Sequence, residues 1–351
     1  MEKKSLLFFM KLLETHSPSG YEVEYQKVWL DYVKQYASVD TDEAGNVIAC
    51  LNPDADFKVL LSGHGDEIGM TVTKIDEKGF IRFTRSGGIN PFILAGLKVE
   101  ILGFGGRVKG VVGYSMNEDR ELPPKPKCDD FYIDCGARSA DQLRKLVRTG
   151  DYIVYESQPQ ILMNDRIVCK GLDDKAGSFI VAEVIRKLSK KKLKVAVYGV
   201  SSTGEETNMR GAYFAGARVK PDMAIACDVT FNTDSPGEEN KNRPEICLEK
   251  GPALSMGSPV NIKVNELIEK AAKRLKMNIQ YELTPEKTST DADKIHFSGC
   301  GVPVSLVSVP IRYMHSPIEM ASLKDIDEII DLFVEMISKL TGKEDLRPVK
   351  P

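Results

Sequence analysis

The chain has 351 residues, of which 42% are hydrophobic and 28% are charged, a composition typical of a globular protein large enough for more than one domain. Its formal net charge of -3 lacks the basic excess of nucleic-acid-binding proteins, so we expect no nucleic-acid partner. The 7 cysteines are irregularly spaced without a Cys-x-x-Cys pair, which favours a reducing, cytoplasmic location over a disulfide framework or a thiolate zinc site.

The first 69 residues are predicted to alternate between helices and strands. Leu6, Phe9 and Leu13 recur at helical spacing, which predicts an amphipathic helix packed on the body. A signal peptide is disfavoured because the apolar run is short and no small-residue cleavage site follows. The next predicted elements are a helix at 21–37, a hairpin at 37–51 that turns at 44–46, and a buried strand at 57–63. No later stretch is apolar for long enough to cross a membrane, so no membrane partner is expected.

Residues 70–161 have a different pattern. Short strand-like runs alternate there with Gly-rich turns, and only 139–150 is predicted to be helical. We therefore expect a small β-rich domain at 70–161, inserted into a catalytic α/β domain made of 1–69 and 162–342. Residues 343–351 are expected to form a disordered tail, because apolar residues that could anchor it are lacking.

The alternation of helices and strands returns after residue 161. The predicted helices lie at 174–190, 209–219, 264–277 and 321–340, and the predicted strands at 194–200, 222–229 and 302–310. Such alternation predicts an α/β fold with a mixed, mostly parallel sheet that is covered by helices.

Acidic residues and histidines follow several of these strands or precede a helix. They are His64, Asp66, Asp173, Asp174, Glu205, Glu206, Asp228 and His315. Each has an ordinary explanation alone, such as a structural histidine, a helix cap or a solvated loop. Ligands bind at the carboxyl ends of strands in open α/β sheets. The recurrence of these groups at equivalent positions therefore favours one shared site.

The residue types indicate that this site binds metal. Histidines and carboxylates without cysteine suit Zn2+, Co2+ or Mn2+. A two-metal centre needs a bridging carboxylate and roughly two further protein ligands for each ion. The residues that could meet this need are His64, Asp173, Glu206, Asp228 and His315. One carboxylate would remain as the general base that a metal-bound water requires, whereas a glycosidase pair chosen from this set would leave the histidines unexplained.

Motifs along nearly the whole chain resemble those of the glutamyl/leucyl aminopeptidase family of dinuclear-metal exopeptidases, whose members form tetrahedral particles. The motifs are SPSGYE (17–22), GHGDEIGM (63–70), GLDDKAG (171–177), GEETNMRGA (204–212), CDVTFNTDSPG (227–237), STDADKIHFSGCGVP (289–303) and RYMHSPIEMAS (312–322). The resemblance implies two divalent ions, Zn2+ or Co2+. It implies that one ion is held by His64, Asp173 and Asp228, and the other by Asp173, Glu206 and His315. It also implies that Glu205 is the general base, that Asp66 orients His64, and that Asp174 supports the site without ligation.

The same resemblance implies a metal-dependent aminopeptidase that acts on peptides as a homo-oligomer, with the inserted domain mediating assembly. The alternatives are a related amidohydrolase of N-acyl amino acids or small peptides, an endoglucanase, and a non-catalytic scaffold. Asn208, Gly65 and Lys175 depart from the family pattern, and we expect them to affect substrate preference and assembly more than chemistry. His16 is expected at the surface or in a turn, and His296 is expected to be structural.

Overall fold

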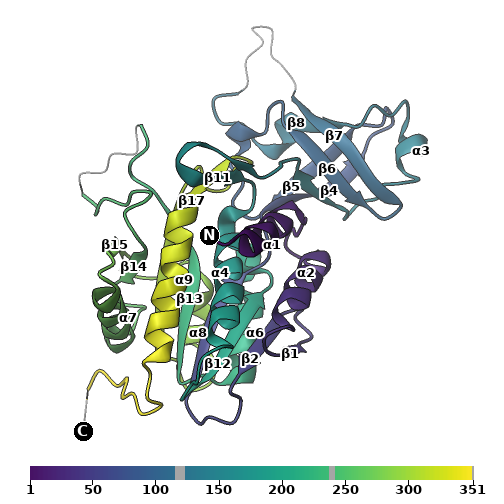
Figure 1. The fold of residues 1–351 in the computed structure, drawn as a ribbon. Coiled ribbons are helices and arrows are strands. Elements are labelled where there is room, and N and C mark those ends of the chain that lie inside the picture. The colour runs from purple at the N-terminus through teal and green to yellow at the C-terminus, as the bar shows by residue number, and fades with distance from the viewer. Residues whose placement is uncertain (115–122, 237–241, 350–351) are drawn as a thin grey trace.

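The computed structural model of the chain describes residues 1–114, 123–236 and 242–349. Figure 1 shows a large sheet covered by helices and, beside it, a small β-structure. The sheet is mixed and has 11 strands, and the β-structure is a closed barrel. The predicted α/β fold with a small β-rich part is therefore confirmed. Within the described ranges, no helix has both the length and the apolar character needed to cross a membrane.

Four parallel strands form the centre of the sheet, in the order β12, β3, β13 and β16. Their bounds are β3 (Lys58–His64), β12 (Ala196–Ser202), β13 (Met223–Phe231) and β16 (Val304–Arg312). Most of their residues are buried because helices cover both faces, which explains their continuous apolar runs. The pairing aligns Ser202 with His64 and Asp228 with Ser308, so the carboxyl ends of the strands meet at one edge.

Antiparallel strands extend this centre on both sides. They are β1 (Ser38–Thr41) and β2 (Val47–Leu51) beyond β12, and β17 (Glu319–Ser322), β11 (Arg166–Cys169) and β10 (Gln160–Ile161) beyond β16. A branch from β16 is formed by β14 (Ala253–Met256) and β15 (Gln280–Leu283). Strands β1 and β2 pair as the predicted hairpin. Among the named strands of the described residues, parallel pairing occurs between the four central strands and between β14 and β15.

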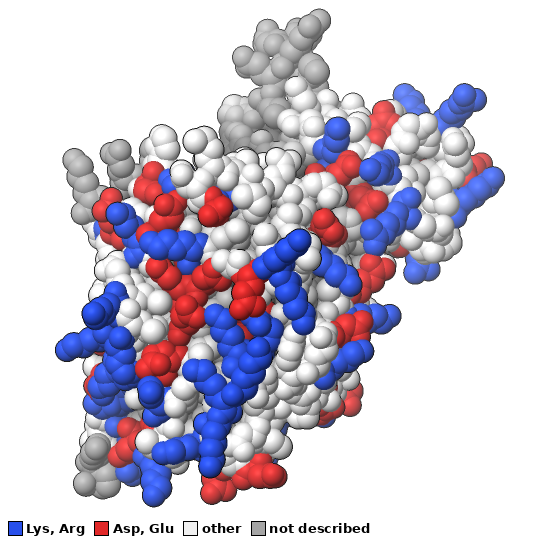
Figure 2. Space-filling model, viewed as in Figure 1, with Lys and Arg blue, Asp and Glu red and all other residues white. Residues whose placement is uncertain are grey.

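Helices on the two faces of the sheet bury separate cores. They are α1 (Lys3–Glu14), α2 (Val23–Val33), α4 (Leu172–Leu188), α5 (Glu205–Asn208), α6 (Arg210–Val219), α7 (Ile262–Leu275), α8 (Asp291–His296) and α9 (Leu323–Ser338). The larger core contains residues of α1, α2, α4, α7 and α9, and another contains residues of α6 and α8. The predicted N-terminal amphipathic helix is confirmed, since α1 buries Phe9 and Leu13. Figure 2 shows acidic and basic side chains mixed over the face seen in Figure 1.

Two glycines allow α4 to approach β3 at the edge where the strands end. A Cβ atom on Gly63 would lie 2.5 Å from backbone atoms of Gly177 and Ser178, and one on Gly177 would lie 2.4 Å from the carboxylate of Asp174. A larger residue would force the helix away from the strand. The close contact lets Asp174 Oδ2 accept a hydrogen bond from the backbone N–H of His64 at 3.0 Å.

Six antiparallel strands close the barrel around a core of its own, in the order β4, β5, β8, β7, β6 and β9. Their bounds are β4 (Gly69–Ile75), β5 (Ile81–Ser86), β6 (Lys98–Gly103), β7 (Gly106–Tyr114), β8 (Phe131–Asp134) and β9 (Tyr152–Tyr155). The helix predicted at 139–150 is shorter than expected, since α3 covers only Ala140–Leu143. The chain then continues as turns that bury Val147 in the barrel core. The division of the chain into a catalytic domain and a separate domain at 70–161 stays a prediction.

Two expectations from the sequence are corrected by the structure. The tail is anchored, because Leu346 packs on the larger core and its carbonyl accepts a hydrogen bond from the side-chain amide of Asn261 at 3.1 Å. His16 is not in a surface turn: its side chain is 11% exposed, and its Nε2 lies 2.7 Å from Glu100 Oε2 on β6. Burial lowers the pKa of His16 to about 4. This contact connects the α/β part to the barrel.

A buried ion-pair cluster joins three segments beside the strand ends. Glu67, just after β3, accepts hydrogen bonds from Lys170 Nζ at 2.6 Å and from the backbone N–H of Ser17 at 2.9 Å. Lys175 Nζ lies 3.3 Å from the same carboxylate, and the three charged side chains are at most 2% exposed. Burial alone would raise the pKa of Glu67, but Lys170 and Lys175 outweigh it and lower that pKa to about 2. Lys175 therefore has a structural role in this cluster.

We expect Glu67→Gln to lower the free energy of unfolding at pH 7 by about 3–5 kcal/mol, because two buried ammonium groups lose their partner. In the wild type the Glu67 contribution is complete above the ordinary pKa of 4.5 and is lost as the pH falls from there towards about 2. The difference between the two proteins should therefore shrink by roughly 3 kcal/mol over this window. Urea unfolding at a series of pH values measures it.

Glu77→Gln is the matched control, since Glu77 is an exposed glutamate of the barrel. Its free energy of unfolding should stay within about 0.5 kcal/mol of the wild type at every pH. A Glu67→Gln effect that does not change with pH would contradict the proposed charge pairing.

Candidate metal centre

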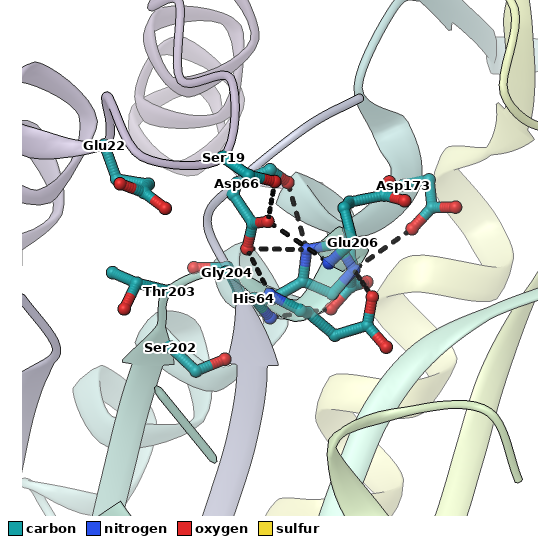
Figure 3. A network of polar contacts seen from close by, with 12 residues as sticks. Ser19, Glu22, His64, Asp66, Asp173, Ser202, Thr203, Gly204 and Glu206 are labelled. Carbon is teal, nitrogen blue, oxygen red and sulfur yellow. Dashed lines mark hydrogen bonds and ion pairs between the residues drawn. The ribbon is translucent and has the colours of Figure 1, made fainter. Parts of the chain in front are cut away.

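All five predicted ligands lie together at the carboxyl edge of the parallel strands. His64 ends β3, Asp228 lies in β13, Asp173 lies at the start of α4, Glu206 lies in α5, and His315 follows β16. Their ligand atoms form two groups, each within 4.8 Å: His64 with Asp173 and Asp228, and Asp173 with Glu206 and His315. Figure 3 shows the side chains of His64, Asp173 and Glu206 pointing towards one another.

Asp173 belongs to both groups and presents one oxygen to each histidine. Its Oδ1 lies 3.2 Å from His64 Nε2, and its Oδ2 lies 3.2 Å from His315 Nε2. Two ligands bound at about 2.0–2.1 Å to one tetrahedral Zn2+ are themselves roughly 3.3 Å apart. Burial would raise the pKa of Asp173, but hydrogen bonds from His315 and His64 outweigh it and lower that pKa. The geometry is that of a carboxylate able to bridge two cations.

The backbone directs the Nε2 atom of each histidine towards Asp173. His64 Nδ1–H donates to the carbonyl oxygen of Asp66 at 3.0 Å, and His315 is hydrogen bonded to the backbone of Gly88. Gly88 packs so closely that a Cβ atom there would lie 2.4 Å from His315 Nδ1. A neutral imidazole that carries its proton on Nδ1 has its lone pair on Nε2, where a metal ion can bind.

Among the described residues, too little positive charge lies beside the buried carboxylates of this site to balance their negative charge. Burial raises the pKa of Glu206, and the charge of Asp173 raises it further. Burial likewise raises the pKa of Asp228 well above its usual range. Glu206 Oε1 is buried and has no hydrogen-bond partner among the described residues. An unpaired buried polar atom is costly, so these residues fit one or more divalent cations, with nitrogen and oxygen donors that suit Zn2+ or Co2+.

Glu205 lies beside these groups but belongs to neither. Its Oε2 is 3.7 Å from His64 Nε2, and 9% of its side chain is exposed. Burial raises its pKa well above the usual range, and Asp228 is among the carboxylates that add to this, although His64 opposes it. Glu205 lines a cavity of about 450 Å3, together with Asp173, Glu206, Asp228 and His315. A second cavity of about 820 Å3, between α2, the β1–β2 turn and α6, contains none of the candidate ligands.

Asp66 holds the segment that carries the glutamate pair. Its Oδ1 accepts from the backbone N–H of Glu205 at 3.0 Å, and its Oδ2 accepts from that of Glu206 at 3.2 Å and from the Ser19 hydroxyl at 2.6 Å. Its carboxylate is 3.5 Å from His64 Nδ1, so the closer contact to the imidazole is made by its backbone carbonyl. Gly204, at φ 66°, begins the turn from β12 into α5. Asp66 therefore positions both glutamates as well as His64.

Glu319 is a site residue that sequence reasoning missed. Its Oε2 accepts from the backbone N–H of Asp173 at 3.1 Å, and its Oε1 accepts from that of His315 at 2.8 Å. The side chain is 1% exposed, and burial raises its pKa well above the usual range. The signal available in the sequence was an acidic residue four positions after His315, at the start of a short strand.

The departures from the family pattern have local explanations. Asn208 Oδ1 accepts from the backbone N–H of Arg210 at 3.1 Å, and Asn208 lines the 450 Å3 cavity. A Cβ atom on Gly65 would lie 2.5 Å from the ring of Tyr25, so a bulkier residue would not fit there. His296 Nδ1 donates to the Val302 carbonyl at 2.9 Å and does not line the cavity, which agrees with the structural role expected for it.

Comparison with known proteins identifies a family for most of the chain. Residues 45–332 match a family model described as M42 glutamyl aminopeptidase. A protein of Acetivibrio thermocellus is 35% identical over 324 residues, which cover 91% of this chain and 94% of that protein. The lysyl aminopeptidase of Pyrococcus furiosus is 32% identical over 337 residues, which cover 94% of this chain and 96% of that protein.

Solved structures with the same fold cover nearly the whole chain. The TET aminopeptidase of a marine sediment Thaumarchaeota archaeon has a TM-score of 0.89 at 30% identity, covering 96% of both chains. The TET1 peptidase of Pyrococcus horikoshii, described as assembling into a tetrahedron or a large octahedral shell, has a TM-score of 0.84 at 26% identity. That match covers 96% of this chain and 100% of that one.

Proposed function

This chain belongs to the M42 glutamyl aminopeptidase family and is a metal-dependent aminopeptidase, and we propose that it works with two divalent cations, Zn2+ or Co2+. One cation would be held by His64, Asp173 and Asp228, and the other by Asp173, Glu206 and His315. The observation that carries this proposal is the position of Asp173, which faces one histidine with each oxygen. The unpaired oxygen of Glu206 supports it.

Glu205 is proposed to be the general base and acid of peptide hydrolysis. When bound, the cations held by these residues would lower the pKa of a water molecule and polarise the scissile carbonyl. Glu205 would accept a proton from a water molecule as the oxygen of that water attacks the carbonyl carbon, and would return the proton to the amine nitrogen as the C–N bond breaks. Asp66 holds the backbone N–H groups of Glu205 and Glu206. One carboxylate can thus face the cations while its neighbour remains free to move a proton.

The acidic cavity favours a free peptide N-terminus as the substrate end. Of the carboxylates that line it, Asp173, Glu206 and Asp228 would be neutralised by the proposed cations, and Glu205 remains to complement the positive charge of an α-ammonium group. An N-acylated amino acid lacks this charge. The same cavity therefore favours an aminopeptidase over the related amidohydrolase that accepts N-acyl amino acids.

The protein is proposed to be a cytoplasmic homo-oligomer whose barrel part, 70–161, mediates assembly. The described assembly of the Pyrococcus horikoshii relative supports oligomer formation. Exposed aromatic residues on the barrel, Phe92 at 61% and Phe104 at 55%, supply apolar contact area for an interface. All seven cysteines are free thiols, which suits a reducing compartment.

A substrate panel with and without chelator tests the activity. The metal-loaded protein should cleave aminoacyl-p-nitroanilides, lose this activity with chelator, and regain it with Zn2+ or Co2+. N-acyl amino acids and soluble cellulose should remain intact. Cleavage of N-acyl amino acids would favour the amidohydrolase, and cleavage of cellulose the endoglucanase. A metal-loaded protein inactive on the whole panel would favour the non-catalytic scaffold.

Glu205→Gln should lower turnover of a leucyl-p-nitroanilide by about 100- to 10,000-fold, because general acid-base catalysis is lost. Bound metal, measured by elemental analysis, should stay near the wild-type content, since Glu205 belongs to neither ligand group. His64→Ala should instead lose metal. Glu43→Gln, at an exposed glutamate, is the control and should behave as the wild type. Unchanged turnover in Glu205→Gln would refute the assigned role.

Light scattering of the full chain should give a mass that is a multiple of the 38.9 kDa subunit. Phe92→Asp combined with Phe104→Asp should reduce this mass, because charges are disfavoured at the core of an interface. Leu7→Asp on α1, where Leu7 is 62% exposed, is the matched control and should leave the mass unchanged. A single-subunit mass for the wild type would rule out the oligomer.

A further inference from the structure

The 450 Å3 cavity is lined by a further acidic residue besides the candidate ligands and Glu205. Its lining extends from Asp173 and His315 to β15 and the loop after it, where Glu282, Thr284 and Thr288 contribute. Glu282 belongs to neither candidate metal group. Its carboxylate therefore faces the cavity without a proposed role in the chemistry.

Neighbouring strands hold Glu282 in place. Its Oε1 accepts a hydrogen bond from the Ser308 hydroxyl on β16 at 2.7 Å, and the Thr230 hydroxyl on β13 is also hydrogen bonded to it. Ser308 is aligned with the candidate ligand Asp228 on the adjacent strand, and adjacent strands lie about 4.8 Å apart. Glu282 is thus only a few strand widths from the candidate metal centre, on the strand β15 that branches from β16 through β14.

Glu282 has no cationic partner in the described part of the chain. No ion pair is found for it there, whereas the buried Glu67 is paired with two lysines. No lysine or arginine occurs among the described residues that line the cavity. Burial raises the pKa of Glu282, while the hydroxyls of Thr230 and Ser308 oppose this by stabilising the charged form. A positive charge delivered by a ligand would complete this arrangement.

The rest of the cavity suits the stem of a long basic side chain. Leu306 and Met314 line it together with Glu282. Lysine and arginine side chains pack their methylene groups on apolar surface and hold the charged end in a polar place. A chain that lies along Leu306 and Met314 would therefore bring its charged end to Glu282.

We propose that Glu282 selects peptides with an N-terminal lysine or arginine by receiving the side-chain cation of that residue. This inference rests on the proposed aminopeptidase function, which it deepens by naming the substrate class. It assigns the proton-transfer chemistry to Glu205 and the side-chain preference to Glu282.

Matched p-nitroanilides of lysine and norleucine test the proposal, because the two differ only in the terminal ammonium group. The wild type should prefer lysine, and Glu282→Gln should lower the lysine-to-norleucine ratio of kcat/KM by about 10- to 100-fold, the effect of losing a charge-assisted hydrogen bond. Glu282→Lys should reverse the preference in favour of a glutamyl substrate. Glu286→Gln, at an exposed glutamate of the following loop, is the control and should keep the wild-type ratio.

Two kinetic results would overturn the inference. One is a wild-type enzyme without preference for lysine over norleucine. The other is an equal loss on both substrates in Glu282→Gln, which would assign Glu282 to the α-ammonium group common to them.

Calorimetric binding of L-lysinamide and L-norleucinamide gives a readout that needs no turnover. The wild type should bind L-lysinamide more tightly, and Glu282→Gln should lose this difference. Failure of the aminopeptidase function would appear as an enzyme inactive on both p-nitroanilides, and the binding difference would still decide the role of Glu282. Equal binding of the two amides by the wild type would reject it.

Discussion

The repulsion between buried carboxylates is the constraint on which this structure depends. The largely buried side chains of Asp173, Glu205, Glu206 and Asp228 share one edge of the sheet, where like charges cannot all be ionised without compensation. Two imidazoles supply only part of the positive charge. The proposed cations would supply the remaining positive charge that lets these carboxylates be ionised together.

The carboxylates that surround this site are instead compensated by backbone N–H groups. Asp66 and Glu319 each accept hydrogen bonds from the backbone N–H groups of two residues whose side chains belong to the candidate site. Asp174 does the same for the backbone of His64. The peptide dipoles thus balance part of the charge of each of these three carboxylates, and the same hydrogen bonds fix the position of the site residues that donate them.

The local pattern of hydrophobic residues was sufficient to predict which residues lie at the ends of the parallel strands. His64 and Glu206 could be placed from apolar runs alone, because parallel strands bring their carboxyl ends to one edge. The pattern of hydrophobic residues could not reveal Glu319, since its importance comes from accepting hydrogen bonds from residues distant in the chain. It also failed for Leu346 and His16, because one apolar side chain or one contact between the two parts of the fold is enough to bury a segment that looks exposed in sequence.

The order of the proposed ligands along the chain determines when the site can form during biosynthesis. His64 is made before the barrel, Asp173 after it, and His315 later still. Until residue 315 has been translated, one proposed cation lacks a histidine, and until residue 319 has been translated, the carboxylate that aligns Asp173 with His315 is missing. A partly translated chain therefore has no complete centre.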